Sequence, residues 1–322
     1  MRQTNMIRFS TDDIGPEDRF DQWREVRGKS LFGVTIELAA EKRRAFKGAF
    51  QAHRVGSAMT SEMRASAYHV SRTEADIARI AGDSLCIAFQ VKGGGLLDTG
   101  GDRVQSFKDG DMAISYSDLP YRATPGGHDE FHFRVITVPF DNELMLGGQT
   151  RDLLATRFTE TAYARPFRAL FNAISERHAH LANPDAEVAH IARLAIMARG
   201  RLAPGMPEVR AALRSGLRYA AEEIMARDKH QQKLTPAKVA LELGISVRQL
   251  HVVFEHAELT FARTLASMRI SEARRLLVER PALPVTEVAY ACGFDSLATF
   301  YRLFAGAYGM APGEFRASGS LH

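Results

Sequence analysis

The chain has 322 residues, 45% of them hydrophobic, which is enough for two ordinary domains with buried cores. Its net charge of +4 lies wholly from Arg210 onward, where 15 Lys and Arg accompany 11 Asp and Glu, whereas residues 1–209 hold 27 of each. Two cysteines exclude a disulfide framework and a cysteine-based zinc site, and the absence of an apolar run near 18 residues excludes a membrane-spanning helix.

The first part of the chain changes from helical to strand-like spacing. Asp12–Val26 carries Phe20, Trp23 and Val26, which predicts a helix packed on a core, with the single tryptophan in that core. From Leu31, short alternating or apolar runs are separated by Gly, Asp or Pro, and each is predicted to be a strand: Val34–Leu38, Phe46–His53, Ala67–Val70, Ser84–Val91, Arg103–Phe107, Asp111–Tyr116 and Glu130–Val138. Such a series predicts a β-sandwich or barrel.

Glycine-rich turns separate the central runs. Residues 92–95 and 99–102 bracket Leu96 and Leu97, and Asp109–Gly110 is predicted to form a hairpin turn. Gly93–Gly95 lacks the Lys-Ser/Thr partner of a phosphate-binding loop, so we expect no nucleotide site there.

Residues 128–132 contain two histidines and a glutamate, which are common metal-ligand types. His128, Glu130 and His132 would share one strand face only if the strand began by residue 128, and Gly126–Gly127 favours a turn at that point. The stretch also lacks the HxH pair that such sites commonly use. We therefore expect no metal and no cofactor.

Helical spacing returns after Phe140. Leu153, Leu154 and Phe158, then Phe167–Ile174, and then Val188–Ala198 fit amphipathic helices. These helices could cover the barrel or hold two chains together. Ala203–Pro207 is the clearest linker in the chain.

The last third of the chain contains two copies of one two-helix sequence pattern. Each copy has a Val-Ala pair, three further residues, a glycine and an apolar residue: Val239, Ala240, Gly244 and Ile245, then Val288, Ala289, Gly293 and Phe294. Apolar residues then recur at i, i+3, i+4 and i+7, as Leu250, Val253, Phe254 and Ala257, and as Phe300, Leu303, Phe304 and Ala307. Each glycine suits a left-handed helix end, and Ser246, with Asp295 or Ser296, suits the start of the next helix. The pattern predicts two helix-turn-helix units.

A long helix is expected between the two copies. Phe261–Glu279 carries Leu265, Met268, Leu276 and Leu277, and Pro281 follows it. At about 1.5 Å per residue, it could hold the two second helices roughly 30 Å apart, close to the spacing of successive major grooves of DNA.

Residues 293–316, GFDSLATFYRLFAGAYGMAPGEFR, resemble the signature of AraC/XylS-type transcription regulators, and SVRQLHVVF and RISEARRLL extend the likeness over about the last third of the chain. In that family the second helix of each unit lies in the major groove. The resemblance implies that eight residues contact DNA: Arg248, Gln249, His251, Val252, Leu297, Ala298, Tyr301 and Arg302. Val252, Leu297 and Ala298 stand where many relatives have basic or polar residues, and these apolar side chains would suit contacts with thymine methyls. Direct base readout would then depend more on Arg248, His251, Tyr301 and Arg302.

The Gly-Asp turn before Met112–Ile114 and the following Leu119–Tyr121 are similar to the cupin-like effector-binding domain found in one branch of this family. The expected architecture is an α+β multidomain chain. It has a cupin-like effector-binding barrel at 1–145, a helical dimerisation or cover segment at 146–202, a linker at 203–208 and a double helix-turn-helix DNA-binding domain at 209–322. The resemblance further implies a homodimer, a small-molecule effector such as an organic acid, and activation through RNA polymerase. A bacterial cytoplasmic location follows, on the nucleoid when bound to double-stranded DNA. Residues 1–10 do not resemble a signal peptide.

Three alternatives stand beside this interpretation. A metal-dependent cupin-type enzyme with a helical tail would need converging His and carboxylate ligands, and we expect no enzyme activity. A DNA-repair alkyl acceptor would need a reactive cysteine, whereas Cys292 is expected to be a small buried group. A ligand-independent DNA-binding regulator remains the third.

Overall fold

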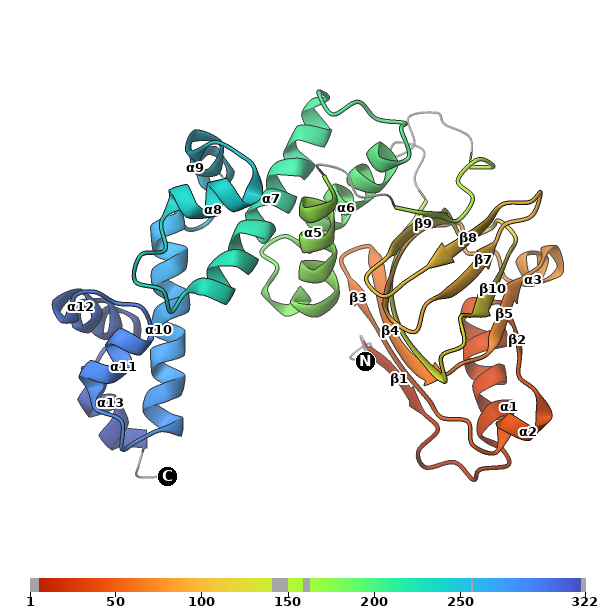
Figure 1. The fold of residues 1–322 in the computed structure, drawn as a ribbon, viewed down its shortest axis with the longest axis horizontal. Coiled ribbons are helices and arrows are strands. Elements are labelled where there is room, and N and C mark those ends of the chain that lie inside the picture. Colours follow the sequence, from red (N-terminus) through yellow and green to blue (C-terminus); the bar gives the residue numbers. More distant parts are fainter. Residues whose placement is uncertain (1–5, 141–149, 159–162, 256, 320–322) are drawn as a thin grey trace, which may run out of the picture. The chain divides into compact units, whose positions relative to one another are not determined.

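The computed structural model describes residues 6–140, 150–158, 163–255 and 257–319 of the chain. Two compact units, Met1–Leu213 and Arg214–His322, divide inside the long helix α7 (Pro207–Asp228). The first unit is rich in strands and the second is helical, as the fold class predicted (Figure 1). The domain limits set from the sequence stay a prediction, and the expected linker, 203–208, overlaps the first turn of α7.

The strands of the first unit form two antiparallel sheets. The larger sheet has the order β1-β3-β4-β11-β6-β9-β12 and the smaller one the order β2-β5-β10-β7-β8. The larger sheet contains β1 (Met6–Ser10), β3 (Gly48–Val55), β4 (Ala58–Ser66), β6 (Ser84–Lys92), β9 (Met112–Tyr116), β11 (Glu130–Pro139) and β12 (Thr156–Arg157). The smaller sheet contains β2 (Thr35–Glu37), β5 (His69–Arg72), β7 (Gly95–Asp98), β8 (Val104–Phe107) and β10 (Tyr121–Pro125). Among the described strands no ladder joins the two sheets, so the barrel-like unit is not closed by hydrogen bonds.

The seven predicted strands correspond to β2, β3, β5, β6, β8, β9 and β11, and the others were not predicted. The missed strand β4 is the most informative, because it is long and lies between β3 and β11. Its sequence, AMTSEMRAS, has Thr60 as its one β-branched residue. Pairing on both sides therefore decides its conformation against its weak local preference for strand.

The prediction of a hairpin turn at Asp109–Gly110 is wrong. β8 pairs with β7 in the smaller sheet, whereas β9 pairs with β6 in the larger one, so residues 108–111 carry the chain from one sheet to the other. Gly110 has the positive φ (+88°) that favours glycine. The Asp109 carboxylate accepts a hydrogen bond of 2.8 Å from the backbone N–H of Gly93, which ties this turn to the other crossing loop. The residues do form a turn, as the sequence indicated. Which sheet the next strand joins depends on pairing with a strand distant in the sequence, and the turn residues do not encode that pairing.

The N-terminal helix runs further than predicted. Helix α1 (Arg19–Trp23) continues into wider π-helical turns, η1 (Arg24–Phe32), which end at Gly33 with φ +58°. Trp23 is completely buried, with the rings of Phe46 and Phe50 at centroid distances of 5.6 and 5.9 Å. The expectation that Trp23 belongs to the core is confirmed.

Two helices cover the larger sheet. Helix α5 (Ala164–Glu176) packs on β11 and β4, and α6 (Pro184–Ala198) packs on β3 and on α5. The Phe89 and Phe171 rings lie 5.9 Å apart across this contact, and Arg134 forms an ion pair with Glu176. Leu153, Leu154 and Phe158, predicted to be helical, instead flank the short strand β12, which pairs with β9. Three further short helices also lie in the unit: α2 (Ala40–Arg43), α3 (Glu74–Arg79) and the 3-10 helix η2 (His178–His180).

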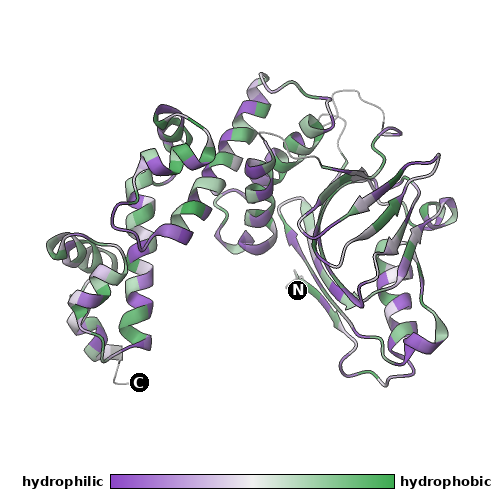
Figure 2. Ribbon diagram, in the orientation of Figure 1, coloured by the Kyte–Doolittle hydropathy of each residue, from purple (hydrophilic) through white to green (hydrophobic). Residues whose placement is uncertain are grey.

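The second unit is organised around α10, whose observed limits, Phe261–Glu279, match the prediction. Phe261 and Leu265 pack in one core cluster with α8 and α9, whereas Ile270 and Leu277 pack in another with α11 and α12. The remaining helices are α8 (Pro236–Leu243), α9 (Val247–Glu255), α11 (Val285–Ala291), α12 (Leu297–Tyr308) and α13 (Pro312–Gly319). In Figure 2, hydrophobic and hydrophilic residues alternate around these helices, as expected for helices that bury one face. None of the described helices combines the length and apolarity that crossing a bilayer requires.

Candidate nucleic-acid interface

The first helix-turn-helix unit begins at a capped helix. The Thr235 hydroxyl accepts a hydrogen bond from the backbone N–H of Lys238 (3.4 Å), and Pro236 occupies the first position of α8. Gly244 ends α8 with φ +68°, and Ile245 packs against the neighbouring core cluster. The turn is built as its residues predicted.

A reciprocal cap starts α9. The backbone N–H of Gln249 donates to the Ser246 hydroxyl (3.1 Å), and the backbone N–H of Ser246 donates to the Gln249 side-chain oxygen (2.9 Å). This is a capping box. Gln249, predicted to contact DNA, therefore uses its carbonyl oxygen to hold the start of its own helix.

The second unit repeats this plan with different supports. Gly293 follows α11 with φ +84°, and Phe294 is buried in the adjacent core. Ser296, rather than Asp295, caps α12, because its hydroxyl accepts the backbone N–H of Thr299 (3.3 Å). The pattern that occurs twice in the sequence therefore gives two similar helix pairs.

The predicted DNA-contacting residues lie on the sides of α9 and α12 opposite their buried residues. Leu250, Val253 and Phe254 are buried on α9, as are Phe300 and Phe304 on α12. Seven of the eight predicted residues are exposed, namely Arg248, Gln249, His251, Val252, Ala298, Tyr301 and Arg302. Leu297 is the exception, since it is half-buried and packs against the core of the second unit.

Two of the predicted DNA-contacting residues, Arg248 and Arg302, carry positive charges that no described carboxylate neutralises. Other arginines of this unit do form ion pairs: Arg227 is paired with Glu242 at 2.7 Å, and Arg275 is paired with Glu279. Within the described residues, no ion pair engages Arg248 or Arg302. Their guanidinium groups can therefore bind an anionic partner without first breaking a salt bridge.

Arg269 was not identified from the sequence. Its hydrogen bonds join α10 to the loop before α8 and so connect the two halves of the second unit. Its Nε donates to the carbonyl oxygen of Lys229 and its Nη2 to that of Gln231, both at 2.8 Å. The Gln232 side chain donates to the carbonyl oxygen of Phe294 at 3.2 Å. The loop before α8 is thereby held against α10 and the second turn. A lone arginine within a basic helix gives no sequence signal for such a role.

Cys292 lies within this packed region. Burial raises the pKa of its thiol to about 11, and its side chain is completely buried. Such a thiol is a poor nucleophile at neutral pH, in agreement with its expected role as a small core group.

The first unit contains a cavity of about 360 Å³ between its two sheets. Residues of β4, β6, β9 and β11 line one side, and residues of β5, β7, β8 and β10 line the other. The volume lies in the lower part of the range, roughly 300–1,000 Å³, that small-molecule sites span. The sequence could not name residues for this site, because the register of the strands was not known.

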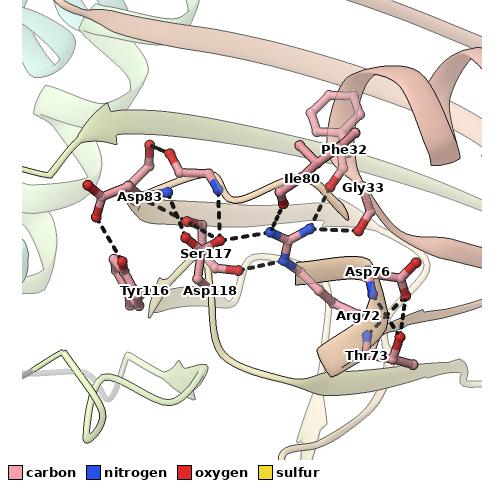
Figure 3. A network of polar contacts seen from close by, with 12 residues as sticks. Phe32, Gly33, Arg72, Thr73, Asp76, Ile80, Asp83, Tyr116, Ser117 and Asp118 are labelled. Atoms are coloured by element: carbon pink, nitrogen blue, oxygen red, sulfur yellow. Dashed lines mark hydrogen bonds and ion pairs between the residues drawn. The ribbon is translucent and has the colours of Figure 1, made fainter. Parts of the chain in front are cut away.

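Arg72, one of the residues that line this cavity, is the centre of a polar network (Figure 3). The Arg72 guanidinium donates to the carbonyl oxygens of Phe32, Gly33, Ile80 and Ser117 and lies 2.8 Å from the Asp118 carboxylate. Burial acts to raise the pKa of Asp118, but backbone N–H groups and Arg72 outweigh it and lower that pKa. The network is therefore saturated and holds loops together.

The histidines near residue 130 do not converge on a common point. His132 bonds to the Glu62 carboxylate at 2.6 Å, whereas His128 and Glu130 are exposed. Among the described residues, no group of three His, Cys, Asp or Glu side chains could hold a metal ion.

Comparisons with known proteins agree with this picture. Residues 239–318 match the family described as "Helix-turn-helix domain". The chain is 24% identical to the transcriptional activator NphR of a Rhodococcus species over 322 residues, which cover 97% of this chain and 92% of that protein. It is 38% identical to the HTH-type transcriptional regulator GlxA of Rhizobium meliloti over 87 residues, 27% of this chain and 26% of that protein.

Among solved structures, the AraC-like transcriptional activator CuxR aligns with a TM-score of 0.47 at 17% identity, covering 88% of this chain and all of that one. ToxT of Vibrio cholerae O395 aligns with a TM-score of 0.34 at 14% identity, covering 81% of this chain and 97% of that one.

Proposed function

We propose that the chain is a DNA-binding transcription regulator of the AraC/XylS type, which its helix-turn-helix match and its likeness to NphR support, and that it reads two adjacent major grooves under the control of a small molecule. The observation that carries this proposal is the pair of similarly built helices, α9 and α12, whose outward faces present Arg248 and His251, and Tyr301 and Arg302. Arginine is well suited to guanine edges, and an exposed tyrosine can contact bases or phosphates.

The predicted residues divide into three roles. Arg248, His251, Tyr301 and Arg302 read bases or bind phosphates, and the exposed Val252 and Ala298 suit thymine methyls. Gln249 contributes to DNA binding mainly by holding the start of α9 through its bond to Ser246. Leu297 acts by packing α12 on its core, because its side chain is already partly buried there.

Two exposed cations outside the recognition helices suit the phosphate backbone. Lys238 lies in the first turn of α8 and Arg263 in the first turn of α10, and both are exposed. Contacts of this kind fix the orientation of a protein on the duplex without reading its sequence.

The cavity of the first unit supports the effector part of the proposal. It lies inside the barrel-like unit and has the volume of a small-molecule site. A ligand there would act by favouring the domain or dimer arrangement in which both recognition helices reach their grooves together.

Four further parts of the proposal follow from the family. The chain activates transcription through RNA polymerase, works as a homodimer in the bacterial cytoplasm and nucleoid, has no enzyme activity and needs no cofactor. For α5 and α6 we retain both a covering and a dimerisation role. Their contacts with the larger sheet support the first, and no exposed large apolar residue of the described chain lies on either helix.

The test is binding of the purified full chain to DNA from upstream of its own gene, titrated with salt. Specific binding should weaken steeply with salt, because basic side chains displace counterions from phosphates. The footprint should cover two adjacent major grooves per chain. Binding no tighter than to unrelated DNA, with or without small organic acids, would contradict the proposal, and stoichiometric iron, manganese or zinc in the protein would favour the enzyme alternative.

A further inference from the structure

Two buried arginines line the cavity of the first unit, and they differ in their partners. Arg72 is surrounded by carbonyl oxygens and the Asp118 carboxylate. Arg27, in the π-helical turns of η1, is only 8% exposed, and its buried Nη1 has no hydrogen-bond partner. Its Nε donates to the sulfur of Met63 at 3.0 Å. The described part of the chain gives this guanidinium no carboxylate and no carbonyl oxygen.

The surroundings of Arg27 compensate its charge only in part. The guanidinium carbon lies 5.3 Å from the ring centroid of Phe32 and 5.7 Å from that of Tyr68, which are cation–π distances. A thioether sulfur is a weak acceptor, and an arginine does not lose its proton in a protein. Burying a charge without a counter-charge is costly. A bound anion would supply the counter-charge that the described residues do not.

The rest of the cavity wall shows what kind of anion would fit. Most of the lining is apolar, and the sole carboxylate among the described lining residues is the exposed Glu130. Seven lining residues are aromatic: Phe32, Tyr68, Phe107, Tyr116, Tyr121, Phe131 and Phe133. A cation would meet no buried negative charge here. A sugar or another polyol would leave most of its hydroxyls unpaired.

We propose that this cavity binds a small organic acid, with its carboxylate on the Arg27 guanidinium and its apolar, ring-sized body against the aromatic wall. A carboxylate can accept two hydrogen bonds from a guanidinium, the geometry that arginine favours. As an effector site, the assignment rests on the proposed regulatory function, but the binding itself does not.

Two tyrosines complete the anion site. Burial raises the pKa of Tyr68 and that of Tyr121, so both phenols stay protonated and neutral at physiological pH. Arg27, Tyr68 and Tyr121 all line the cavity, and the Tyr68 ring centroid lies 5.7 Å from the Arg27 guanidinium carbon. The Tyr121 phenol can donate a hydrogen bond to a carboxylate without adding a charge. The Tyr68 hydroxyl lies 3.7 Å from the Met63 sulfur, a weak acceptor that a carboxylate oxygen would replace.

The first experiment needs no ligand and compares Arg27→Met with Arg72→Met in the full chain. Arg72→Met removes the partner of the Asp118 carboxylate and of several carbonyl oxygens, and its Tm should fall sharply. Arg27→Met keeps the apolar stem and removes a charge that has no counter-ion among the described residues, so its Tm should stay near that of the native chain or rise. A fall as large as that of Arg72→Met would assign Arg27 a structural role and overturn the proposal.

The second experiment measures binding of benzoate, its neutral isostere benzamide, and acetate by calorimetric titration. The native chain should bind benzoate more tightly than benzamide by roughly tenfold to a hundredfold, the equivalent of one charge-assisted hydrogen bond. Acetate, which lacks the apolar body, should bind more weakly than benzoate. Arg27→Met should lose the preference for benzoate over benzamide, and Arg27→Lys should retain part of it.

Several results would overturn the proposal: equal binding of benzoate and benzamide, a preference that survives in Arg27→Met, or acetate binding as tightly as benzoate. So would the absence of millimolar binding for all of benzoate, phenylacetate and hexanoate. Specific DNA binding is measured on the same samples. Failed acid binding with intact specific DNA binding removes this inference alone, whereas acid binding without specific DNA binding removes the regulator function and leaves the site.

Discussion

The two helix-turn-helix units share one sequence pattern but are held in place differently. At Gly244 a Cβ atom would meet open space, so the positive φ alone favours glycine there. At Gly293 a Cβ atom would lie 2.4 Å from the carbonyl oxygen of Lys229, in addition to the positive φ. The first turn is therefore determined by local conformation, and the second by local conformation together with the loop that Arg269 holds. Substitutions at Gly244 and Gly293 should therefore differ in their effect on stability, although the two glycines hold the same position in the motif.

The largest effect that this comparison predicts is that of Gly293→Val. A β-branched residue would be forced into a left-handed conformation and into the backbone of residues 229 and 230. Strain and overpacking together should lower the free energy of unfolding by roughly 3–5 kcal/mol, measured by urea denaturation. Native stability would show that the second turn is not packed as described.

Arg269→Met tests the fastening between the halves of the second unit. The substitution keeps an unbranched apolar stem but removes the bonds to the Lys229 and Gln231 carbonyl oxygens. The free energy of unfolding should fall by roughly 1.5–3 kcal/mol, because two hydrogen bonds from a charged donor are lost. Arg263→Met, on an exposed turn of the same helix, is the matched control and should change stability little. Equal effects of the two variants would contradict the fastening role.

Arg302→Ala should leave the fold intact and weaken specific DNA binding by roughly 1–3 kcal/mol if the arginine contacts a base bidentately. The side chain is exposed and forms no ion pair with the described residues, so the stability of the free protein should hardly change. Fluorescence anisotropy with specific and scrambled duplexes measures both affinity and preference. Unchanged affinity and preference would remove Arg302 from the interface.

The smallest effect is expected for Gly244→Ala, the counterpart of the Gly293 variant. Nothing lies within 4 Å of the added Cβ, so the cost is that of the left-handed conformation alone, roughly 1 kcal/mol. Urea denaturation of both glycine variants side by side measures the difference. A loss at Gly244 as large as at Gly293 would remove the proposed contrast between the turns.

The second unit was largely predictable because its signals are local. Glycine at each turn, hydroxyl caps at Thr235, Ser246 and Ser296, and apolar residues at helical spacing all act within a few residues. Even so, the half-buried state of Leu297 and the capping role of Gln249 depend on tertiary packing and on side-chain geometry, which the spacing does not contain.

The first unit was less predictable because its structure depends on distant pairing. The strand β4 has weak strand preference and is fixed by neighbours on both sides, and the turn at Asp109–Gly110 changes sheets. Arg27 could not be recognised as a site residue at all. A buried, unpaired arginine runs against the usual distribution of charges, so only the structure can reveal it.

The most direct test of the account is a hydroxyl-radical footprint of the native chain, Arg248→Ala and Arg302→Ala on the same specific duplex. If each unit reads its own groove, the native footprint covers two adjacent major grooves, and each variant loses protection mainly in one of them, a different one in each case. If both variants lose the same protected region, or if the native chain protects one groove, the two units do not read DNA side by side.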